Sequence, residues 1–401
     1  MTLTTGTFII NDKEKPVRFG EIEIENTPTQ ATLQHEVKKG IFCQTVITAF
    51  CGSDYEFMKM GRDLNLTPKC PSGKNRLVNG HEGVLWVPEW NKFAVLSVRG
   101  GHAVDPSRYG DDETYFEYGC DKMDGIMCYE GFFNPDMLIP VPNQLLNSGK
   151  IPLNLAKRLC FADPVACILF QRERIEELLA AHNFRLYLSE GLEEEEAKKK
   201  VVAEGFKKIV IFGCGGTGLP AAMLLSRDDI GALVVVARGS EDTPKIRFLK
   251  ANTKAIYVRS ITSEEELAQN IIDALAGKPI LFFAASGTAL ESRIAFDHKV
   301  LGNNGIYASF GVGPRLHIDT MELGFRNQMI FGAINFRKEH MAQAMELLQG
   351  MPLDQLVQIY PIEDLKRDPM AFYHKVYVEN KGIVKAATIW KPEMLDMGLY
   401  K

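Results

Sequence analysis

The sequence predicts an α/β protein, in which a doubly wound parallel sheet is joined to a mainly antiparallel β domain. Three patterns lead to this prediction: a glycine-rich turn between an apolar run and a helical stretch, alternating strand and helix patterns after residue 207, and short β-rich runs between residues 8 and 142. With 401 residues the chain is longer than most single domains. We therefore expect two domains that each bury a core.

The amino-terminal part carries the β-rich pattern. Runs such as 20–25 and 42–47 are bounded by turn residues, which predicts a mainly antiparallel domain. Apolar positions then take helical spacing between 166 and 184. The charged stretch 193–200 is expected to form a solvated helix or loop, since acidic residues precede basic ones by four positions.

From residue 207 the chain alternates between apolar strand patterns and helical patterns, which is typical of a parallel sheet with helices on both faces. We expect buried strands at 209–212, 231–237, 255–258, 280–285 and 305–310. Beyond Phe336 the spacing is helical up to Met345, and a strand-like segment follows at 384–390. We expect this tail to return to the first domain.

The glycine-rich turn has the pattern Gly-x-Gly-x-x-Gly and directly follows the first buried strand. A strand that turns sharply into a helix points free backbone N–H groups and the positive helix terminus at one place, which suits a pyrophosphate. Such turns are also common without a nucleotide, but the second strand closes a βαβ unit and favours a Rossmann domain. The predicted cofactor-binding residues of the turn are Gly213, Gly215, Gly216, Thr217 and Gly218.

The end of the second strand indicates which dinucleotide is bound. An acidic residue there accepts hydrogen bonds from the ribose of NAD, whereas a cation accommodates the 2′-phosphate of NADP. The chain has Arg238 and Ser240 at this place, with Glu241 and Asp242 slightly later. We therefore predict a preference for NADP, with NAD possible. The alternative is a solvated arginine and an ordinary turn serine.

Composition excludes several classes of function. The net charge is −5 and both signs are interspersed, which argues against sequence-independent nucleic-acid binding. The amino terminus has no signal-peptide pattern, and no apolar run is long enough for a membrane span. Eight cysteines occur without a Cys-x-x-Cys pair, so a disulfide framework is not expected. We expect a cytoplasmic protein without a membrane partner.

A second group of chemically active residues lies ahead of the glycine turn. Cys51, Ser53 and Asp54 are followed about thirty residues later by His81 and Glu82. Thiolate, imidazole and carboxylate are ligands of zinc, and a catalytic zinc site uses three protein ligands and leaves one position open. A lone cysteine is more often a buried apolar residue. The combination ahead of a nucleotide-binding fold instead favours a metal site.

This combination is similar to the zinc-type medium-chain dehydrogenases/reductases, which carry Cys-Gly-(Ser/Thr)-Asp and Gly-His-Glu ahead of a Rossmann domain. Within that superfamily the chain most resembles the archaeal-type glucose dehydrogenases, through its segments 117–125, 253–257 and 332–340. The resemblance implies a GroES-like catalytic domain at 1–165 and 337–401, and a Rossmann domain at 166–336.

The resemblance also implies roles for individual residues. Cys51 and His81 would be zinc ligands, and Glu82 would bind the metal directly or through water. Asp163 lies where relatives place a side chain that can approach the metal, and it is a further candidate ligand. Ser53 would begin a proton relay.

Three further residues receive implied roles. Asp54 would orient the metal ligands. Glu117 would bind substrate hydroxyls or a water at the metal, and its alternative is a surface carboxylate. Asn335 would lie near the nicotinamide, and its alternative is a helix N-cap.

Two departures from the family pattern limit the prediction. Segment 99–110 has no cysteine, so one catalytic zinc and no structural zinc is expected. An asparagine that relatives use for sugar contact is absent around 97–99, which leaves glucose itself open.

The predicted function is a zinc-dependent oxidoreductase that transfers hydride between NADP(H) and a sugar-like, polyol or cyclic alcohol or ketone, in a homodimer or homotetramer. The alternatives are a zinc-free quinone or enone reductase and a non-catalytic dinucleotide-binding protein.

Overall fold

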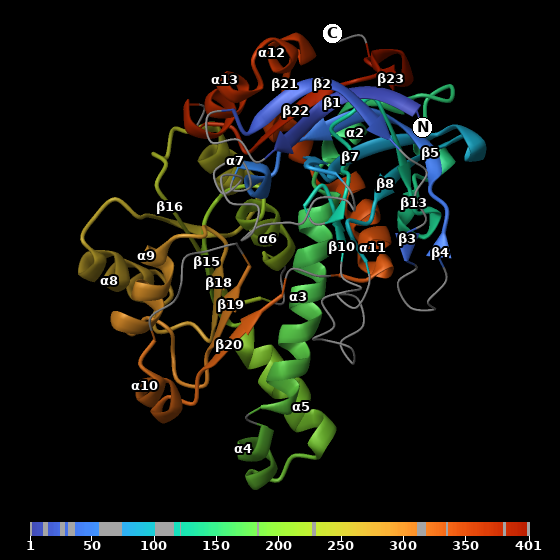
Figure 1. Cartoon of the computed structure of the whole chain (residues 1–401). Helices are drawn as coiled ribbons and strands as arrows, with labels where there is room; N and C mark the ends of the chain where they lie inside the picture. The colour runs from blue at the N-terminus through green and yellow to red at the C-terminus, as the bar shows by residue number, and fades with distance from the viewer. Residues whose placement is uncertain are drawn as a thin grey trace. The chain divides into compact units, whose positions relative to one another are not determined.

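The computed structural model describes residues 2–10, 15–24, 29–30, 37–55, 74–100, 116–120, 122–182, 184–226, 230–310, 318–333, 336–379 and 382–398. The chain divides into two compact units (Figure 1). Unit 1 consists of Met1–Ala166 and Asn335–Lys401, and unit 2 is the continuous segment Cys167–Ile334.

Unit 1 is built on a seven-stranded sheet in which the strand order is β13-β8-β7-β5-β22-β21, with β12 also paired to β5. The strands are β5 (Ile41–Ala49), β7 (Glu82–Val87), β8 (Lys92–Leu96), β12 (Glu130–Phe133), β13 (Leu138–Pro140), β21 (Val357–Tyr360) and β22 (Lys385–Ile389). Most neighbours are antiparallel, whereas β21 and β22 are parallel. The C-terminal strand β22 thus lies beside β5, which comes from the opposite end of the chain.

The register of this sheet brings distant residues together. Ala49 at the end of β5 lies opposite Glu82 at the start of β7, and opposite Ala387 of β22 on its other side. Cys51 lies two residues after the end of β5, and His81 directly precedes β7. Three strand ends therefore converge at one edge of unit 1.

Smaller elements surround this sheet. β1 (Thr2–Ile10) pairs with β2 (Val17–Ile24) and β6 (Arg76–Val78), so the β structure begins earlier than the predicted residue 8. Short strands are β3 (Thr29–Gln30), β4 (Val37–Lys38), β9 (Arg99–Gly100), β10 (Phe116–Tyr118), β11 (Lys122–Met123), β14 (Ile151–Pro152) and β23 (Leu395–Asp396). The helices of unit 1 include α2 (Leu153–Leu159), α11 (Lys338–Gly350), α12 (Ile362–Arg367) and α13 (Pro369–His374), and a π-helical turn follows at Lys375–Glu379.

Unit 2 contains a six-stranded sheet in the order β17-β16-β15-β18-β19-β20, and all its neighbours are parallel. The strands are β15 (Lys208–Phe212), β16 (Ala232–Ala237), β17 (Ile256–Arg259), β18 (Leu281–Ala284), β19 (Ile306–Ser309) and β20 (Met329–Gly332). The helices are α3 (Ala162–Ala181, which begins in unit 1), α4 (Phe184–Ser189), α5 (Glu194–Gly205), α6 (Gly218–Leu225), α7 (Pro244–Asn252), α8 (Glu264–Ala274), α9 (Ala289–Ser292) and α10 (Thr320–Phe325). The strand order reverses direction between β15 and β18, which is the doubly wound topology predicted from the sequence.

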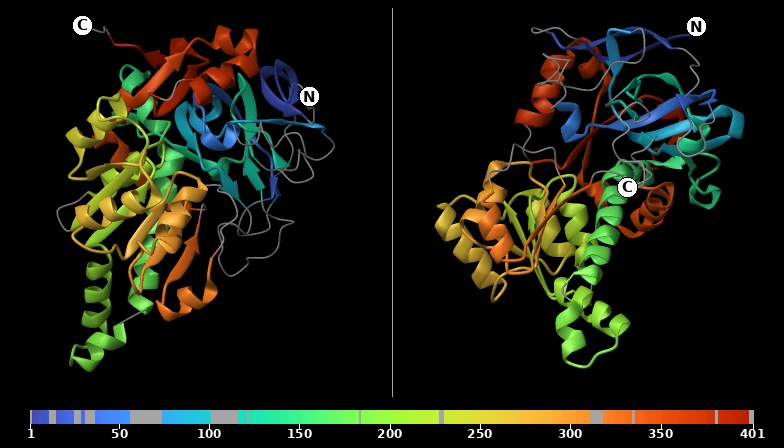
Figure 2. Two further views of the ribbon diagram at one scale, coloured as in Figure 1. Left: turned by 90° about the vertical axis from the view of Figure 1, so that its left-hand side faces the viewer. Right: turned by 60° about the horizontal axis from the view of Figure 1, so that its bottom comes forward.

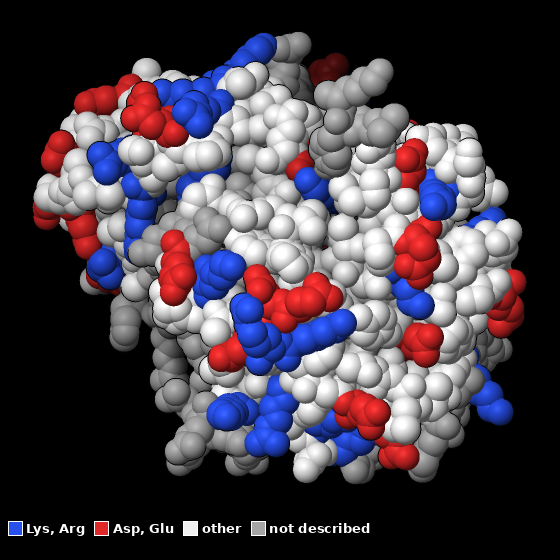
Figure 3. Space-filling model, turned by 90° about the horizontal axis from the view of Figure 1, so that it is seen from above, with Lys and Arg blue, Asp and Glu red and all other residues white. Residues whose placement is uncertain are grey.

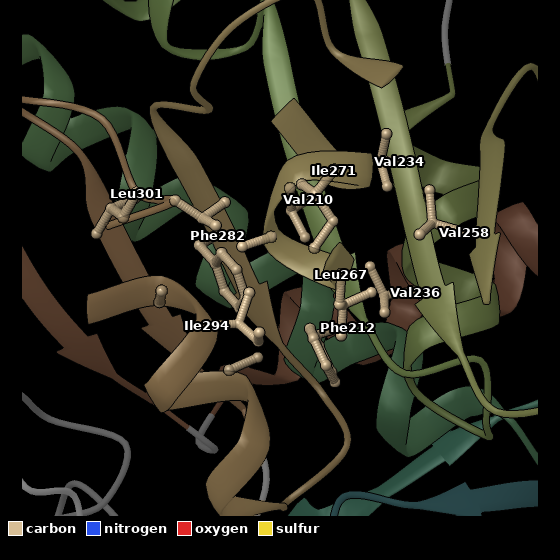
Figure 4. Close-up of a cluster of buried hydrophobic side chains, with 14 of the residues drawn as sticks. Val210, Phe212, Val234, Val236, Val258, Leu267, Ile271, Phe282, Ile294 and Leu301 are labelled. Carbon is tan, nitrogen blue, oxygen red and sulfur yellow. The ribbon is translucent and has the colours of Figure 1, made fainter. Parts of the chain in front are cut away.

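Helices cover both faces of the sheet of unit 2 (Figure 2), and its inner strands β15 and β16 are almost entirely buried. Figure 4 shows one face, where Val210, Phe212 and Phe282 pack against Leu267 and Ile271 of α8. The opposite face carries Ile211, which faces Gly218 of α6. Burial on both faces explains why these strands read as continuous apolar runs rather than as alternating patterns. The α/β fold class is thereby confirmed.

The charged surface agrees with the interspersed sequence pattern. Figure 3 shows one face of the molecule, on which basic and acidic side chains are intermixed. On α12, for example, Asp364 pairs with Arg367 at 2.9 Å and with Lys375 at 3.5 Å. None of the helices in the described ranges combines the length and the apolar character that a membrane crossing requires.

Candidate functional site

The convergent strand ends of unit 1 gather three potential metal ligands. One ligand atom each from Cys51, His81 and Glu82 lies within 4.8 Å of the other two. His81 and Glu82 are buried, with exposed fractions of 2% and 3%, and Cys51 is partly buried. Ligands of one tetrahedral zinc ion lie about 3.5 Å apart, so small side-chain adjustments suffice for the three to share an ion. In the described part of the chain, the group does not include Asp163, which lies buried in the first turn of α3.

Asp54 organises the backbone of this site. Its carboxylate accepts hydrogen bonds from the N–H groups of Cys51 at 2.8 Å and Gly80 at 3.2 Å. The side chain is completely buried. Burial raises the pKa of this carboxyl to about 6, against the opposing effects of His81 and the two N–H donors. Asp54 therefore joins the Cys51 loop to the residue before His81.

Two tyrosines from the C-terminal part of the chain hydrogen-bond to the Cys51 loop and to the segment before His81. The hydroxyl of Tyr377 donates to the carbonyl of Cys51. The side-chain amide of Asn79 donates to the hydroxyl of Tyr373, which itself lies 3.4 Å from the sulfur of Met127. Burial raises the pKa of both tyrosines well above the usual value. Both hydroxyls are therefore protonated at neutral pH and remain able to donate hydrogen bonds.

Lys385 is a buried cation in the site that the sequence analysis did not identify. Its ammonium group pairs with Glu82, donates to the carbonyl of Cys160 at 3.2 Å, and lies over the ring of Phe161. Burial alone would lower the pKa of Lys385, but the charges of Glu82 and Cys51 outweigh it and raise the pKa. The sequence signal that could have identified it is the single lysine in the largely apolar strand pattern 384–390. A buried cation needs a partner, so a lysine at this place predicts a buried acidic group nearby.

Cys120 is a second residue that the sequence analysis left without a role. Its sulfur lies 3.3 Å from Nδ1 of His81, and both side chains are buried. Burial raises the pKa of the Cys120 thiol, and the nearby carboxylate of Glu117 acts in the same direction. Glu117 itself is 8% exposed on β10. The predicted alternative, a surface carboxylate, is therefore wrong.

Ser53 has a buried hydroxyl that lacks a hydrogen-bond partner within the described part of the chain. It lies in a helical turn at 52–55, between Cys51 and Asp54. Its oxygen makes no hydrogen bond with any residue that the structure describes. A buried polar group of this kind normally has a partner, so this oxygen is available to a ligand that enters the site.

In unit 2, the glycine turn has the three local environments that a dinucleotide-binding turn requires. Gly213 has a φ of +121° and lies against the backbone of Ala285 and Ser286. A Cβ atom at Gly215 would meet nothing within 4 Å, whereas one at Gly218 would lie 2.1 Å from the carbonyl oxygen of Gly213. Thr217 is the residue before α6, and Gly216 lies next to it. The turn is therefore tight at its ends and open in the middle.

The turn lies where the strand order reverses. Gly213 follows β15, and its neighbours Ala285 and Ser286 follow β18. Ligands of doubly wound sheets bind at such a reversal, outside the carboxyl ends of the strands. The structure thus gives the turn both the backbone geometry and the position of a nucleotide site.

The residues predicted to select the cofactor lie on the surface after β16. Arg238 and Ser240 are exposed. Glu241 pairs with Lys250 at 2.6 Å, so its carboxylate is neutralised by a residue of α7. Asn335 and residues 101–110 lie outside the described residues.

Comparison with solved structures gives the class of fold. Haloferax mediterranei glucose dehydrogenase, in complex with NADP, Zn and gluconolactone, is 17% identical with a TM-score of 0.66, and 96% of this chain and 99% of that chain are covered. The 2R,3R-butanediol dehydrogenase of Bacillus subtilis is 16% identical with a TM-score of 0.66 over 97% and 99% of the two chains. The L-idonate 5-dehydrogenase of Escherichia coli is 15% identical with a TM-score of 0.64, and 97% of this chain and 98% of that chain are covered.

The chain therefore has the fold of these dehydrogenases over nearly its whole length, as the sequence resemblance led us to expect. By sequence it is similar to the glucose 1-dehydrogenase of Methanocella arvoryzae, with 23% identity over 328 residues that cover 75% of this chain and 78% of the relative. No protein-family model matches the chain.

Proposed function

We propose that the chain is a zinc-dependent dehydrogenase that transfers hydride between NADP(H) and a sugar-like, polyol or cyclic alcohol or ketone. The observation that carries this proposal is the grouping of Cys51, His81 and Glu82 within 4.8 Å. The open glycine turn in unit 2 supports the cofactor part. The chain also shares its fold with known sugar and alcohol dehydrogenases.

The residues present fit a zinc ion. One thiol, one imidazole and one carboxylate match the donor types of catalytic zinc sites, and three protein ligands leave a position for substrate. Cys51 and His81 would hold the ion, with Glu82 as a direct or water-mediated third ligand and Asp163 as a further candidate. When bound, the ion would act as a Lewis acid on the oxygen of the substrate.

The protein residues supply position and proton transfer. Asp54 and Tyr377 hydrogen-bond to the backbone N–H and carbonyl of Cys51, which would fix the position of the thiol. The hydroxyl of Ser53, which has no partner among the described residues, can both donate and accept a hydrogen bond, and this suits a group that passes on the substrate's hydroxyl proton. Glu117 would bind further substrate hydroxyls.

The cofactor would be held by unit 2. The N–H groups around Gly215 to Gly218 would bind the pyrophosphate at the start of α6, where the helix dipole favours negative charge. Arg238 and Ser240 would contact the 2′-phosphate, and Asn335 would lie near the nicotinamide. The pairing of Glu241 with Lys250 supports NADP because it neutralises an acidic group near the proposed phosphate site.

The substrate class follows from the relatives. The sequence relative is named a glucose dehydrogenase, and the structural neighbours are glucose, idonate and butanediol dehydrogenases. Their common feature is a small substrate with neighbouring hydroxyl groups. We therefore propose a polyhydroxylated alcohol, or its carbonyl product, as substrate.

The experiment that tests this function combines metal analysis with a substrate screen. Purified protein would be analysed for zinc and then assayed for NADP reduction and NADPH oxidation with sugars, cyclitols, simple alcohols and ketones. We expect about one zinc per chain and activity that chelation abolishes and added zinc restores. Activity in metal-free protein would instead favour a quinone or enone reductase. A protein that binds the dinucleotide without turnover in the screen would favour the non-catalytic alternative.

Two glycine substitutions are expected to have different effects. Gly218→Ala places a Cβ against the carbonyl of Gly213, so overpacking should lower the free energy of unfolding by about 2 kcal/mol. Gly215→Ala meets open space and should leave stability within about 0.5 kcal/mol, while it weakens NADPH binding at least tenfold. Chemical denaturation and NADPH fluorescence titration measure the two effects. Equal NADPH affinity of Gly215→Ala and wild type would refute a pyrophosphate site at this turn.

Arg238 is expected to determine the preference for NADP. Arg238→Ala should raise KM for NADP roughly tenfold or more, because a charged hydrogen bond to phosphate is lost, and should change KM for NAD less than twofold. Steady-state kinetics with both cofactors provide the measurement, and Arg247→Ala, an exposed arginine on α7, is the matched control. An equal change for NADP and NAD would contradict the assignment.

A further inference from the structure

Cys120 contacts the histidine of the candidate metal centre from the side of Nδ1. The distance from its sulfur to that nitrogen is 3.3 Å, and the exposed fractions of Cys120 and His81 are 1% and 2%. This is hydrogen-bonding distance for sulfur, in a place from which water is excluded. The thiol is therefore the direct neighbour of Nδ1.

The position of Cys120 relative to His81 is fixed by backbone packing. Gly119 has a φ of +71°, and a Cβ atom there would lie 2.4 Å from the carbonyl oxygen of Gly80. Gly125 approaches the same carbonyl as closely, with a corresponding distance of 2.1 Å. Cys120 and His81 each directly follow one of the glycines in contact, Gly119 and Gly80. This close backbone contact by itself places the sulfur of Cys120 near the ring of His81.

Backbone hydrogen bonds hold residues 78–80 against residues 125–127. The N–H groups of Gly125, Ile126 and Met127 donate to the carbonyls of residues 78, 80 and 79, at 2.7, 2.9 and 3.0 Å. The turn itself is closed by the N–H of Cys120, which donates to the carbonyl of Glu117 at 3.1 Å. The chain thus places a sulfur beside His81 in a structure that has little freedom to relax.

Asp54, which the sequence suggested as the residue that orients the metal ligands, binds backbone N–H groups. Both oxygens of Asp54 accept hydrogen bonds from the backbone, one from Cys51 and one from Gly80. A histidine that binds a metal through one nitrogen normally donates a hydrogen bond from the other, which fixes the orientation of its ring. Among the residues that the structure describes, the group that meets Nδ1 of His81 is the sulfur of Cys120.

We propose that Cys120 is a positioning residue for the metal ligand His81. Its sulfur accepts the hydrogen bond from Nδ1–H, and Nε2 is thereby kept as the nitrogen that binds the metal. This inference rests on the proposed zinc site, and it assigns a thiol to a place where carboxylates and carbonyls are usual.

The test uses the full chain loaded with Co²⁺, whose visible absorption bands depend on ligand geometry. Cys120→Ala should weaken Co²⁺ and Zn²⁺ binding about tenfold and shift or broaden the visible bands. Cys120→Ser keeps a hydrogen-bond acceptor and should remain within about threefold of wild type. Cys128→Ala is the matched control, because Cys128 is equally buried but the hydrogen bonds described for its sulfur go to the backbone carbonyls of Gly125 and Glu130. It should bind metal like wild type.

Four outcomes would overturn the proposal. They are wild-type affinity and spectrum in Cys120→Ala, an equal loss in Cys120→Ser, an equal loss in Cys128→Ala, and no cobalt binding by wild type. The last outcome would also overturn the zinc site, whereas the first three leave it intact.

A second measurement does not depend on the folding of any variant. Long-range ¹H–¹⁵N spectra of the zinc-loaded wild type should show His81 protonated at Nδ1 and bound to metal at Nε2. The reverse assignment would contradict the proposal.

Discussion

Cys51→Ala is expected to remove the zinc and to lower kcat/KM by at least about a thousandfold. The thiol is one of only three side chains in the described metal group. A Lewis acid supplies several kcal/mol of charge stabilisation in the transition state, and about 4 kcal/mol corresponds to a factor of about a thousand in rate. Zinc content per chain and kcat/KM with the best substrate of the screen are the measurements.

The control for this prediction is Cys43→Ala. Cys43 is a fully buried cysteine on β5 whose thiol donates to the carbonyl of Ile41. Its replacement should reduce stability while the remaining folded protein keeps its zinc and its kcat/KM. A Cys51→Ala protein with substantial activity would support the zinc-free reductase instead.

Lys385→Met is expected to lower the free energy of unfolding of the metal-free protein by about 3–5 kcal/mol. The lysine and Glu82 are buried, with side-chain exposures of 4% and 1%. Loss of the ammonium group would leave an unpaired carboxylate in a site that excludes water. Chelated protein is used so that bound metal does not contribute to the measurement, and chemical denaturation provides the free energy.

The double variant Lys385→Met/Glu82→Gln separates charge from packing. It removes both charges and keeps similar side-chain volumes, so most of the lost stability should return. If the double variant is as unstable as Lys385→Met, the loss comes from packing or from the hydrogen bond to the carbonyl of Cys160, and the ion pair contributes little.

Much of the fold could be predicted because its signals are local in sequence. The Gly-x-Gly-x-x-Gly turn, the strand before it and the alternation after it predicted the doubly wound sheet, since each pattern reports on neighbouring residues. The edge strand β20 was missed. Its sequence, Met-Ile-Phe-Gly, is an apolar run like those of the inner strands, but the strand is short and two of its four residues are exposed, as expected at the edge of a sheet.

The candidate site was predictable only as far as its motifs extend. Cys51, His81 and Glu82 lie in short motifs, whereas Lys385 reaches Glu82 from a strand 303 residues further along the chain. Cys120 meets His81 only because two glycines allow a close backbone approach. Contacts of this kind depend on tertiary packing, and a single sequence does not encode them in any local pattern.

The most direct test of the account is the location of zinc in crystals of the holoprotein by anomalous diffraction at the zinc absorption edge. We predict one strong peak within bonding distance of the sulfur of Cys51 and a ring nitrogen of His81. Zinc-free crystals of active protein, or a peak away from these two residues, would contradict the central claim that they share a catalytic metal ion.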